Sequence, residues 1–477
     1  RFCKKRGLSP GPRVPWEETR WTVFTDLYQY AKNNLLDVGE YENVPQKAQR
    51  PLKSDLVAQR KLDAFYDEWG DGADFYAVAN GWEEFKNHHN CYDFWQQLDA
   101  ALGGRLPPMK HVVIDEYHDA TPLMAAVTER WVRNAETAIV AGDPDQVVNG
   151  YAGASPGFFE ELGERTGEEI PVVKLGRSWR CPDEHFAAAA RVLSAERPPP
   201  DLETDGPGTL HRHPSGDFAT DDSGEWSFPD PAEQGSPAWL YEEFGSDMLY
   251  LTRTQKQASG VAAALDAAGI IYQSQSSVGG DWEMRTRLLT LLNMLESVEP
   301  PKEATPRMIQ SLTDREEPNI EKYSLTVDEA KLLAKHSHGH YIDDEGDLRS
   351  YLNRLNPEAD TVPLTEWNKY ITPKWWLRYT NGAASIGELT GLSDRDGHAM
   401  KRAADRYELP IDVADVDTRI LTIHASKGVE AADVVVYDGV TNSITNAMAE
   451  SDPLRENEAR TWYVALTRAR KRLHIMR

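Results

Sequence analysis

Two acidic residues stand side by side directly after a short apolar run. The stretch VVIDEYHDAT, residues 112–121, passes from valine and isoleucine into Asp115 and Glu116, and Asp119 follows three residues later. Adjacent carboxylates repel each other and are costly to desolvate at the end of a buried strand. One carboxylate that binds a divalent metal, and another that activates a water molecule, would account for the pattern. The sequence therefore predicts hydrolytic chemistry here, and the alternative is a strand that simply ends in solvent.

Further stretches carry groups that hydrolysis of a nucleoside triphosphate needs. They are AGDPDQVVNGYAGA, LGRSWRCPDE, LYLTRT, ILTIHASKGVEAADVV and EARTWYVALTRAR. Positive charge must lie near the γ-phosphate as negative charge shifts during the reaction. Arginine suits this task because its planar fork stays charged and binds phosphate oxygens. The alternative for each arginine is a surface ion pair.

Alternating strands and helices are expected to position these motifs. Runs of strand type are HVVIDE, TAIVAGD, PVVKLG, DMLYLTRT, RILTIHAS and DVVVYDGV. Helical stretches follow most of them, including ASGVAAALDAAG, which Gly269 should close, and WEMRTRLLTLLNMLESV. Strand, helix and strand in this order predict an α/β fold with a parallel sheet, whose ligands lie at the carboxyl ends of the strands.

Three regions differ from this alternation. Residues 1–100 are expected to be mostly helical. Residues 196–238 are rich in Pro, Gly, Asp and Ser, which predicts an irregular loop. Residues 300–412 are helical in pattern, contain several tryptophans, and interrupt the second α/β part of the chain.

Length and composition limit the class of protein. The chain has 477 residues, too many for one core, with 40% hydrophobic and 27% charged residues, as in globular proteins. It contains no apolar run long enough to span a membrane, and its first residues do not form a signal peptide. Three scattered cysteines indicate a reducing compartment, so a cytoplasmic location is expected.

The net charge of −25 predicts a strongly hydrated surface. Arginine outnumbers lysine and the acidic residues are spread along the whole chain, a pattern that suits a protein from a halophile. If so, the midpoint of thermal unfolding should fall as KCl is lowered from molar to about 0.1 M, because less salt screens the acidic residues from one another. A melting curve that does not change with KCl would contradict the adaptation.

In their order and content the six stretches resemble the superfamily 1 DNA helicases of the UvrD/Rep type. The resemblance covers nearly the whole chain and implies two RecA-like P-loop NTPase-type α/β units, the first incomplete, with helical insertion domains. The implied division has five parts: residues 1–100, the start of domain 1A and insert 1B; 101–170, domain 1A with motifs II and III; 171–299, the first part of domain 2A; 300–412, insert 2B; and 413–477, the second part of domain 2A with motifs V and VI.

The resemblance implies a catalytic role for each of five residues. Asp115 would hold Mg²⁺ and Glu116 would orient and deprotonate the water. Gln146 would sense the γ-phosphate of ATP. Arg180 and Arg468 would reach the phosphates across the nucleotide cleft.

A second group would bind the rest of the nucleotide. Trp179 stands where the family usually has a tyrosine that stacks on adenine, and the alternative is a core aromatic residue. Glu430 would hold the ribose hydroxyl, and Gly428 would let the backbone approach closely. Lys427 would lie near the phosphates or near Glu116.

Single-stranded DNA is the partner that the resemblance implies, together with duplex DNA. Tyr151 matches the aromatic residue that stacks on bases, and Thr422 and His424 match residues that contact DNA. A separate aromatic and basic cluster in the helical insert could meet the duplex, although a pair of core tryptophans is the favoured interpretation. It consists of Trp375, Trp376, Arg378 and Tyr379.

The chain departs from the family's pattern at several points. His118 replaces the glutamine of the usual DExQD motif. Asn149 and Ala152 stand where motif III usually has tyrosine and arginine, and Ala431 replaces an aromatic residue of motif V. The Gly-rich loop ending in Gly-Lys-Ser/Thr, which cradles the phosphates of ATP, does not occur in the sequence. We therefore expect an N-terminally truncated chain that binds and hydrolyses ATP poorly by itself.

The predicted function is that of an ATP-dependent DNA helicase, moving 3′ to 5′ on single-stranded DNA in repair or replication. The alternative is a protein derived from a helicase that binds single-stranded DNA, or a helicase partner, without hydrolysis. The retained carboxylates and arginines speak against the alternative, because a protein that only binds has no need of them.

Overall fold

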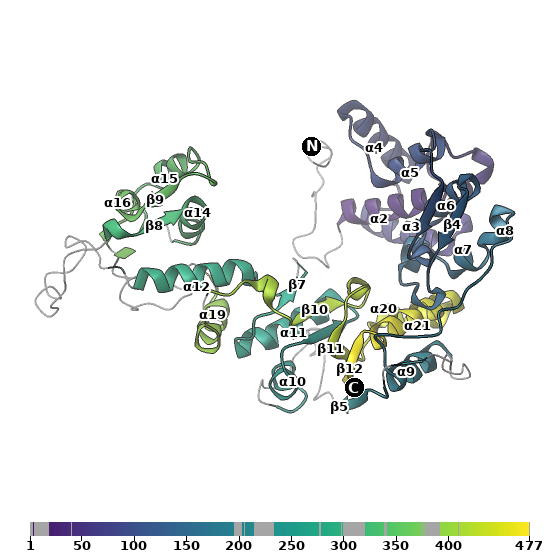
Figure 1. The fold of residues 1–477 in the computed structure, drawn as a ribbon. Coiled ribbons are helices and arrows are strands. Elements are labelled where there is room, and N and C mark those ends of the chain that lie inside the picture. Colours follow the sequence, from purple (N-terminus) through teal and green to yellow (C-terminus); the bar gives the residue numbers. More distant parts are fainter. Residues whose placement is uncertain are drawn as a thin grey trace, which may run out of the picture. The chain divides into compact units, whose positions relative to one another are not determined.

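The computed structural model describes residue 3 and most of the chain from residue 19 to residue 476. The described ranges are 19–39, 41–194, 203–204, 206–213, 233–275, 278–296, 298, 320–337, 341–373, 375–376, 392–408 and 410–476. The chain divides into two compact units (Figure 1). Unit 1 comprises Arg1–His211 and Thr422–Ile475, and unit 2 comprises Arg212–Leu421 and Met476–Arg477.

The first hundred residues are mostly helical, as predicted. Their elements are α2 (Arg20–Asn33), β1 (Leu36–Asp37), β2 (Arg50–Pro51), α3 (Leu56–Trp69), α4 (Phe75–His89) and α5 (Phe94–Gly103). The side chains of Thr19, Asp55 and Asp74 accept hydrogen bonds from backbone N–H groups of the first turns, which fixes where α2, α3 and α4 begin. The helices enclose an aromatic core that includes Phe24, Tyr28, Phe65, Phe75 and Trp95.

Two parallel strands carry the acidic stretches. β3 (His111–Ile114) pairs with β4 (Thr137–Val140), with Val112 opposite Ala138, and α6 (Pro122–Asn134) connects them. Both strands therefore end at the same edge, which brings the residues after Ile114 and those after Val140 together. The expectation that the first strand is buried is only half right. Val112 is buried but Val113 is 70% exposed, because within the described residues β4 is the one strand beside β3.

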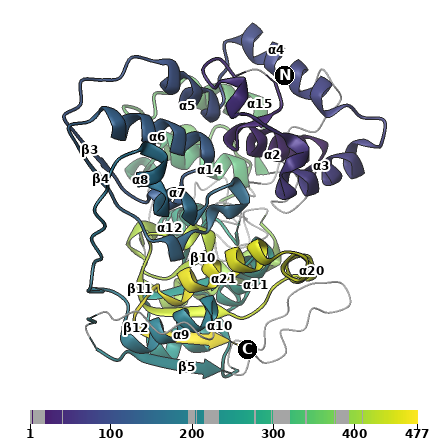
Figure 2. The same cartoon turned by 90° about the vertical axis from the view of Figure 1, so that its right-hand side faces the viewer.

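The rest of unit 1 consists of helices and a set of neighbouring strands. The helices are α7 (Pro156–Glu160), α8 (Leu162–Thr166), α9 (Asp183–Leu193), α20 (Asn442–Glu450) and α21 (Asp452–Leu466). β5 (Thr209–His213), β12 (Ala469–Met476) and β11 (Ala431–Tyr437) are neighbours in that order. α21 packs along α9 (Figure 2).

Two predictions about this part of the chain are wrong. Residues 171–176, PVVKLG, form no strand, and Val172 and Val173 are 80% and 82% exposed. No described strand pairs with the segment. The next residue, Arg177, forms a single isolated β-bridge with Glu203. Residues 209–213 lie in the region expected to be irregular, yet they form β5, because β12 provides a partner strand.

Unit 2 contains a second α/β part. Its elements are α10 (Pro237–Phe244), β6 (Met248–Thr252), α11 (Gln255–Ala268), β7 (Gln273–Ser274), α12 (Trp282–Glu296) and β10 (Arg419–Thr422). β6, β10 and β7 are neighbours in that order, and β10 runs parallel to β7. A capping box between Thr254 and Gln257 starts α11, and Gly269, at φ +68°, ends it as predicted.

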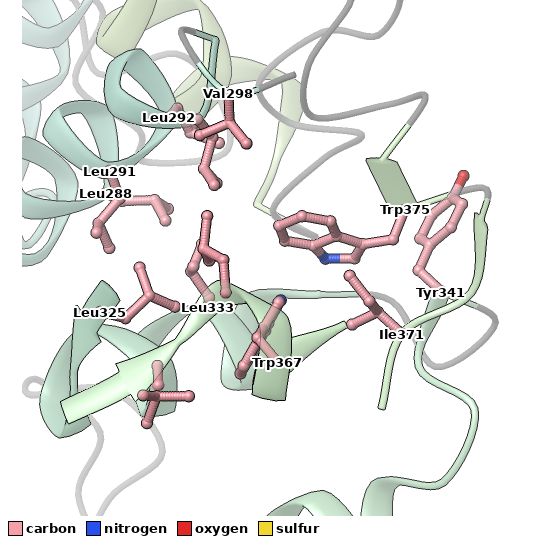
Figure 3. Close-up of a cluster of buried hydrophobic side chains, with 14 of the residues drawn as sticks. Leu288, Leu291, Leu292, Val298, Leu325, Leu333, Tyr341, Trp367, Ile371 and Trp375 are labelled. Atoms are coloured by element: carbon pink, nitrogen blue, oxygen red, sulfur yellow. The ribbon is translucent and has the colours of Figure 1, made fainter. Parts of the chain in front are cut away.

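A helical block with its own core completes unit 2. It contains β8 (Ser324–Thr326), α14 (Val327–His336), α15 (Glu345–Leu352), β9 (Thr361–Pro363), α16 (Leu364–Trp367) and α19 (Asp394–Arg406). Figure 3 shows Leu325, Leu333, Trp367 and Trp375 in this core, together with residues of α12. Trp375 and Trp376 are 0% and 1% exposed, which confirms the interpretation as core tryptophans. Arg378 and Tyr379 lie outside the described residues.

The α/β class is confirmed by the strand–helix alternation and the parallel strand pairs of both units. The further division into insert and core domains stays a prediction. Across the described residues, no helix has the length and apolar character that crossing a membrane requires.

Candidate active site

Glu116 lies in a backbone conformation that residues other than glycine rarely adopt. Its φ and ψ are +54° and 30°, in the left-handed region, which costs about 1–3 kcal/mol. Two hydrogen bonds hold the turn: the Glu116 N–H donates to Oδ1 of Asp115 at 2.9 Å, and the Glu116 carbonyl accepts from the Asp119 N–H at 3.0 Å. The Glu116 side chain remains 57% exposed. A strained backbone that presents a carboxylate to solvent is typical of a catalytic position.

A lysine from the distant SKGVE stretch contacts this carboxylate. Nζ of Lys427 lies 3.1 Å from Oε2 of Glu116 and also forms an ion pair with Asp119. Lys427 follows a short 3₁₀ turn, His424–Ser426, that continues from the β10 end. The structure therefore places Lys427 in the Glu116 region, one of the two positions that the sequence left open.

His118 occupies the centre of the same cluster and is 1% exposed. Its Nδ1 accepts the N–H of Asp143 at 2.9 Å, and its Nε2 lies 3.2 Å from Oε2 of Glu116 and 2.7 Å from Nζ of Lys427. Burial lowers the pKa of His118, and the positive charge of Lys427 adds to that shift. The imidazole is therefore neutral at neutral pH.

A hydrogen-bonded chain leads from this cluster to the arginines. Nε2 of Gln146 donates to Oδ2 of Asp143 at 2.7 Å, and Oε1 of Gln146 accepts from Nη2 of Arg468 at 2.8 Å. The next link is Thr467, whose carbonyl accepts from Nε of Arg180 at 3.0 Å. The structure thus brings together Glu116, Gln146, Arg180 and Arg468, residues as much as 352 positions apart in the sequence.

Arg468 is buried to 1% exposure and remains a cation. Burial lowers its pKa to about 10, and the charge of Arg180 contributes to the shift. Its Nε donates to the Val464 carbonyl at 2.9 Å, which fixes the guanidinium against the end of α21. Two arginines side by side repel each other, so the pair is suited to an anionic ligand that neutralises both.

An open pocket of about 370 Å³ lies beside Trp179 and Arg180. Its other lining residues are Pro182, Gly206, Pro207, Gly208, Thr209, Arg470 and Lys471. Trp179 is 74% exposed, which rules against a core role, and the guanidinium of Arg177 lies 3.8 Å from its ring centroid. An exposed indole beside cationic side chains can stack on a nucleobase.

One of the two remaining nucleotide candidates, Glu430, lies near that pocket. Oε1 of Glu430 is 3.8 Å from Nη1 of Arg470, a residue that lines the pocket, and both side chains are partly exposed. Gly428 has φ +78° with open space around it, so glycine meets a backbone requirement there.

The candidates for DNA contact are only partly together. Tyr151 is 58% exposed and packs edge-on against His424, with 5.6 Å between ring centroids. Thr422 is the last residue of β10, two positions before His424. Tyr151 and His424 therefore form one aromatic pair at the surface of unit 1.

Asp115 can serve as a magnesium ligand only with help from other groups. It is exposed at the end of β3, and no group of three or more His, Cys, Asp or Glu side chains in the described ranges is arranged to hold a metal ion. Mg²⁺ is commonly held by one or two carboxylates together with waters and substrate phosphates. A single exposed carboxylate fits that mode of binding.

Sequence reasoning missed Asp143 and treated His118 only as a departure. Asp143 belongs to the GDPDQ stretch, but nothing in the sequence says that its N–H meets His118 or that its carboxylate holds Gln146. Arg470 and Lys471 were visible as basic residues after Arg468, and only the fold places them beside Trp179.

Two family models match the chain. Residues 45–166 match the UvrD/REP helicase N-terminal domain, and residues 407–477 match the UvrD-like helicase C-terminal domain. The candidate residues from Asp115 to Tyr151 fall within the first match, and those from Thr422 to Arg468 fall within the second.

Several characterised or named relatives are similar over longer stretches. The ATP-dependent DNA helicase UvrD2 of Mycobacterium tuberculosis is 27% identical over 56% of this chain and 38% of its own length. The putative ATP-dependent DNA helicase YjcD of Bacillus subtilis is 21% identical over 94% of this chain and 63% of its own length. The ATP-dependent DNA helicase PcrA of Leuconostoc citreum is 23% identical over 80% and 56%. The chain thus spans between about two fifths and two thirds of the length of these relatives.

Proposed function

Because the chain belongs to the superfamily 1 helicases of the UvrD/Rep type, we propose that it forms the motor of an ATP-dependent DNA helicase that moves 3′ to 5′ on single-stranded DNA. The proposal extends to unwinding of duplex DNA in repair or replication. ATP and Mg²⁺ would be the nucleotide and the metal.

The hydrogen-bonded chain from Glu116 to Arg180 is the observation that best supports the proposal. A carboxylate, a glutamine and two arginines from separate motifs are linked by contacts that pass through His118, Asp143 and Thr467. A protein that only binds DNA gains nothing from a buried arginine, Arg468, whose charge is repelled by that of Arg180. Hydrolysis of a phosphoanhydride needs that positive charge as negative charge shifts on the phosphates.

Each residue has a defined part in the proposed reaction. Glu116 accepts a proton from the attacking water, and Gln146 orients that water through its amide. Arg180 and Arg468 stabilise the charge on the phosphates. Mg²⁺, held by Asp115, would supply further neutralisation of the phosphate charge.

Nucleotide binding would use the pocket beside Trp179. The indole stacks on adenine and Glu430 accepts a hydrogen bond from the ribose. Lys427, in contact with Glu116, links nucleotide chemistry to the stretch that carries Thr422 and His424. A shift of Lys427 on nucleotide binding would therefore move residues proposed to contact DNA.

The test uses the protein made from the complete reading frame that encodes this chain. Its steady-state hydrolysis of ATP is measured with and without single-stranded DNA, and its unwinding is measured on duplexes with a 3′ or a 5′ single-stranded tail. We expect DNA-stimulated hydrolysis and unwinding from the 3′ tail. Tight DNA binding without any hydrolysis would favour the alternative, a non-hydrolysing DNA-binding protein.

Replacing Tyr151 by alanine should weaken binding of single-stranded DNA. Stacking on one base contributes roughly 1–3 kcal/mol, so the dissociation constant should rise about 5- to 150-fold. Binding of a labelled oligonucleotide, followed by fluorescence anisotropy, measures the change.

Tyr151→Phe keeps the ring and should bind like wild type. Tyr92→Ala removes another exposed tyrosine, 72% exposed against 58% for Tyr151, outside the proposed DNA contacts and serves as the matched control. Unchanged affinity of Tyr151→Ala would show that the ring does not stack on DNA.

A further inference from the structure

His118 stands where the resembled family has glutamine, yet it is among the most completely enclosed polar residues of the site. It is 1% exposed and faces four charged residues: Glu116, Asp119, Asp143 and Lys427. Both ring nitrogens have neighbours at hydrogen-bonding distance. Because so many charged groups surround this position, we expect the exchange of glutamine for histidine to affect the site.

The contacts fix which nitrogen carries the proton. Nδ1 accepts the N–H of Asp143 at 2.9 Å, so Nδ1 has no hydrogen. A neutral imidazole must then be protonated at Nε2. Nε2 lies 3.2 Å from Oε2 of Glu116, its nearest carboxylate oxygen, and 2.7 Å from Nζ of Lys427.

Glu116 is consequently held from two sides. Nε2 of His118 and Nζ of Lys427 lie 3.2 Å and 3.1 Å from the same oxygen, Oε2. Nζ and Nε2 are also 2.7 Å apart, and because an ammonium only donates, Glu116 is the acceptor that the two groups share when Nε2 carries the proton. Two donors on one oxygen leave Oε1 as the oxygen that can receive a proton from water.

Gly142 leaves space for the imidazole ring of His118. A Cβ atom at Gly142 would lie 2.9 Å from Nδ1 of His118 and 3.3 Å from its backbone nitrogen. Such distances are too short for any larger residue, so Gly142 allows the close approach of the strand end to the imidazole. Gly142 immediately precedes Asp143, whose carboxylate holds Gln146.

We propose that His118 is a positioning residue for hydrolysis, which orients Glu116 through Nε2–H and couples it, through the Asp143 backbone, to Gln146 and Arg468. The inference rests on the proposed function and deepens it. In this role His118 acts through Glu116 rather than on the nucleotide or the water. Its role is to hold the carboxylate of Glu116 in a fixed orientation relative to Gln146 and Arg468, which are proposed to contact the γ-phosphate.

Two substitutions separate the two contacts of the ring. The amide nitrogen of His118→Gln can reach the place of Nε2 and donate to Glu116, but its side chain gives no acceptor at the place of Nδ1. The side-chain oxygen of His118→Asn can replace Nδ1 and accept from Asp143, but Asn is too short to reach Glu116. The pair therefore tests the Glu116 contact against a merely structural contact with the loop.

We expect His118→Asn to lower kcat about 10- to 100-fold, a loss typical of residues that orient a catalytic group, with KM for ATP within about threefold of wild type. His118→Gln should retain kcat within about threefold. Wild-type kcat in His118→Asn, or an equal loss in both variants, would overturn the positioning role. His111→Asn and His111→Gln, at an exposed histidine of β3, are the matched controls.

A spectroscopic test needs no hydrolysis. In the wild-type protein labelled with ¹⁵N-histidine, the signal lost in His118→Gln should show the tautomer protonated at Nε2. A proton on Nδ1 would overturn the proposal, whatever the rates. Absence of hydrolysis in the wild type together with the Nε2–H tautomer would instead count against the proposed function, so the two failures are distinguishable.

Discussion

Replacing Glu116 by glutamine should lower the rate of ATP hydrolysis about 100- to 10,000-fold, the usual contribution of a general base. The amide has nearly the same shape as the carboxylate, and its oxygen can still accept from His118 and Lys427. It cannot take a proton from water, so only the chemical step should suffer. Steady-state hydrolysis at saturating single-stranded DNA measures the loss.

Nucleotide and DNA affinities of Glu116→Gln should stay within about threefold of wild type, because the side chain is largely exposed and the turn around it is held by backbone contacts. Glu136→Gln changes an exposed glutamate between α6 and β4 and is the matched control. Normal turnover by Glu116→Gln would remove Glu116 from the role of base, and weaker DNA binding without slower hydrolysis would assign it to DNA contact instead.

The sequence predicted the strands and helices best where local patterns and their partners agree. β6 is fully buried and α11 has both a capping box and a closing glycine, so the local pattern alone was sufficient. PVVKLG has the same apolar, β-branched character, but no described strand pairs with it. The sequence of β5 predicts a loop, yet β5 is a strand because it pairs with β12. A strand depends on its neighbour, which a single stretch of sequence does not reveal.

The site followed the same rule. The types of residue in the motifs predicted a catalytic role for the carboxylates and arginines, which stays a prediction, and the fold links Glu116, Gln146, Arg180 and Arg468 in one network of contacts. The central place of His118 could not be predicted, because it depends on Nδ1 meeting a backbone N–H 25 residues away. The residue types in a sequence do not reveal which side chains will contact which backbone groups.

Exposure decided several alternatives that the sequence left open. Trp179 is exposed beside a pocket, whereas Trp375 and Trp376 are buried in the core of the helical block. In the sequence Trp179 adjoins Arg180 and Trp375 adjoins Lys374, so basic neighbours do not separate the two cases. Burial of an indole depends on the apolar side chains that surround it in three dimensions, and those come from α12, α14 and α16 in the helical block.

Replacing Arg468 by alanine should slow hydrolysis about 1,000-fold or more, as expected for an arginine that neutralises the charge shifting onto the phosphates. The guanidinium stays charged at neutral pH, since burial lowers its pKa only to about 10. Its removal leaves Oε1 of Gln146 and the Val464 carbonyl without this donor, so the free energy of unfolding should also fall by about 1–3 kcal/mol. Hydrolysis and thermal unfolding are therefore measured on the same preparation.

Two comparisons separate the chemical loss from the structural one. Arg468→Lys keeps a positive charge without the planar fork, so it should recover part of the stability but little of the rate. Arg455→Ala, at an exposed arginine of α21, should change neither. Affinity for single-stranded DNA should stay within about threefold in all three variants, because Arg468 is buried and its Nη2 donates to Gln146, whereas Tyr151 is exposed. If Arg468→Ala unfolds at a lower temperature yet hydrolyses ATP normally at a temperature where it is folded, the guanidinium holds the end of α21 in place and takes no part in the reaction.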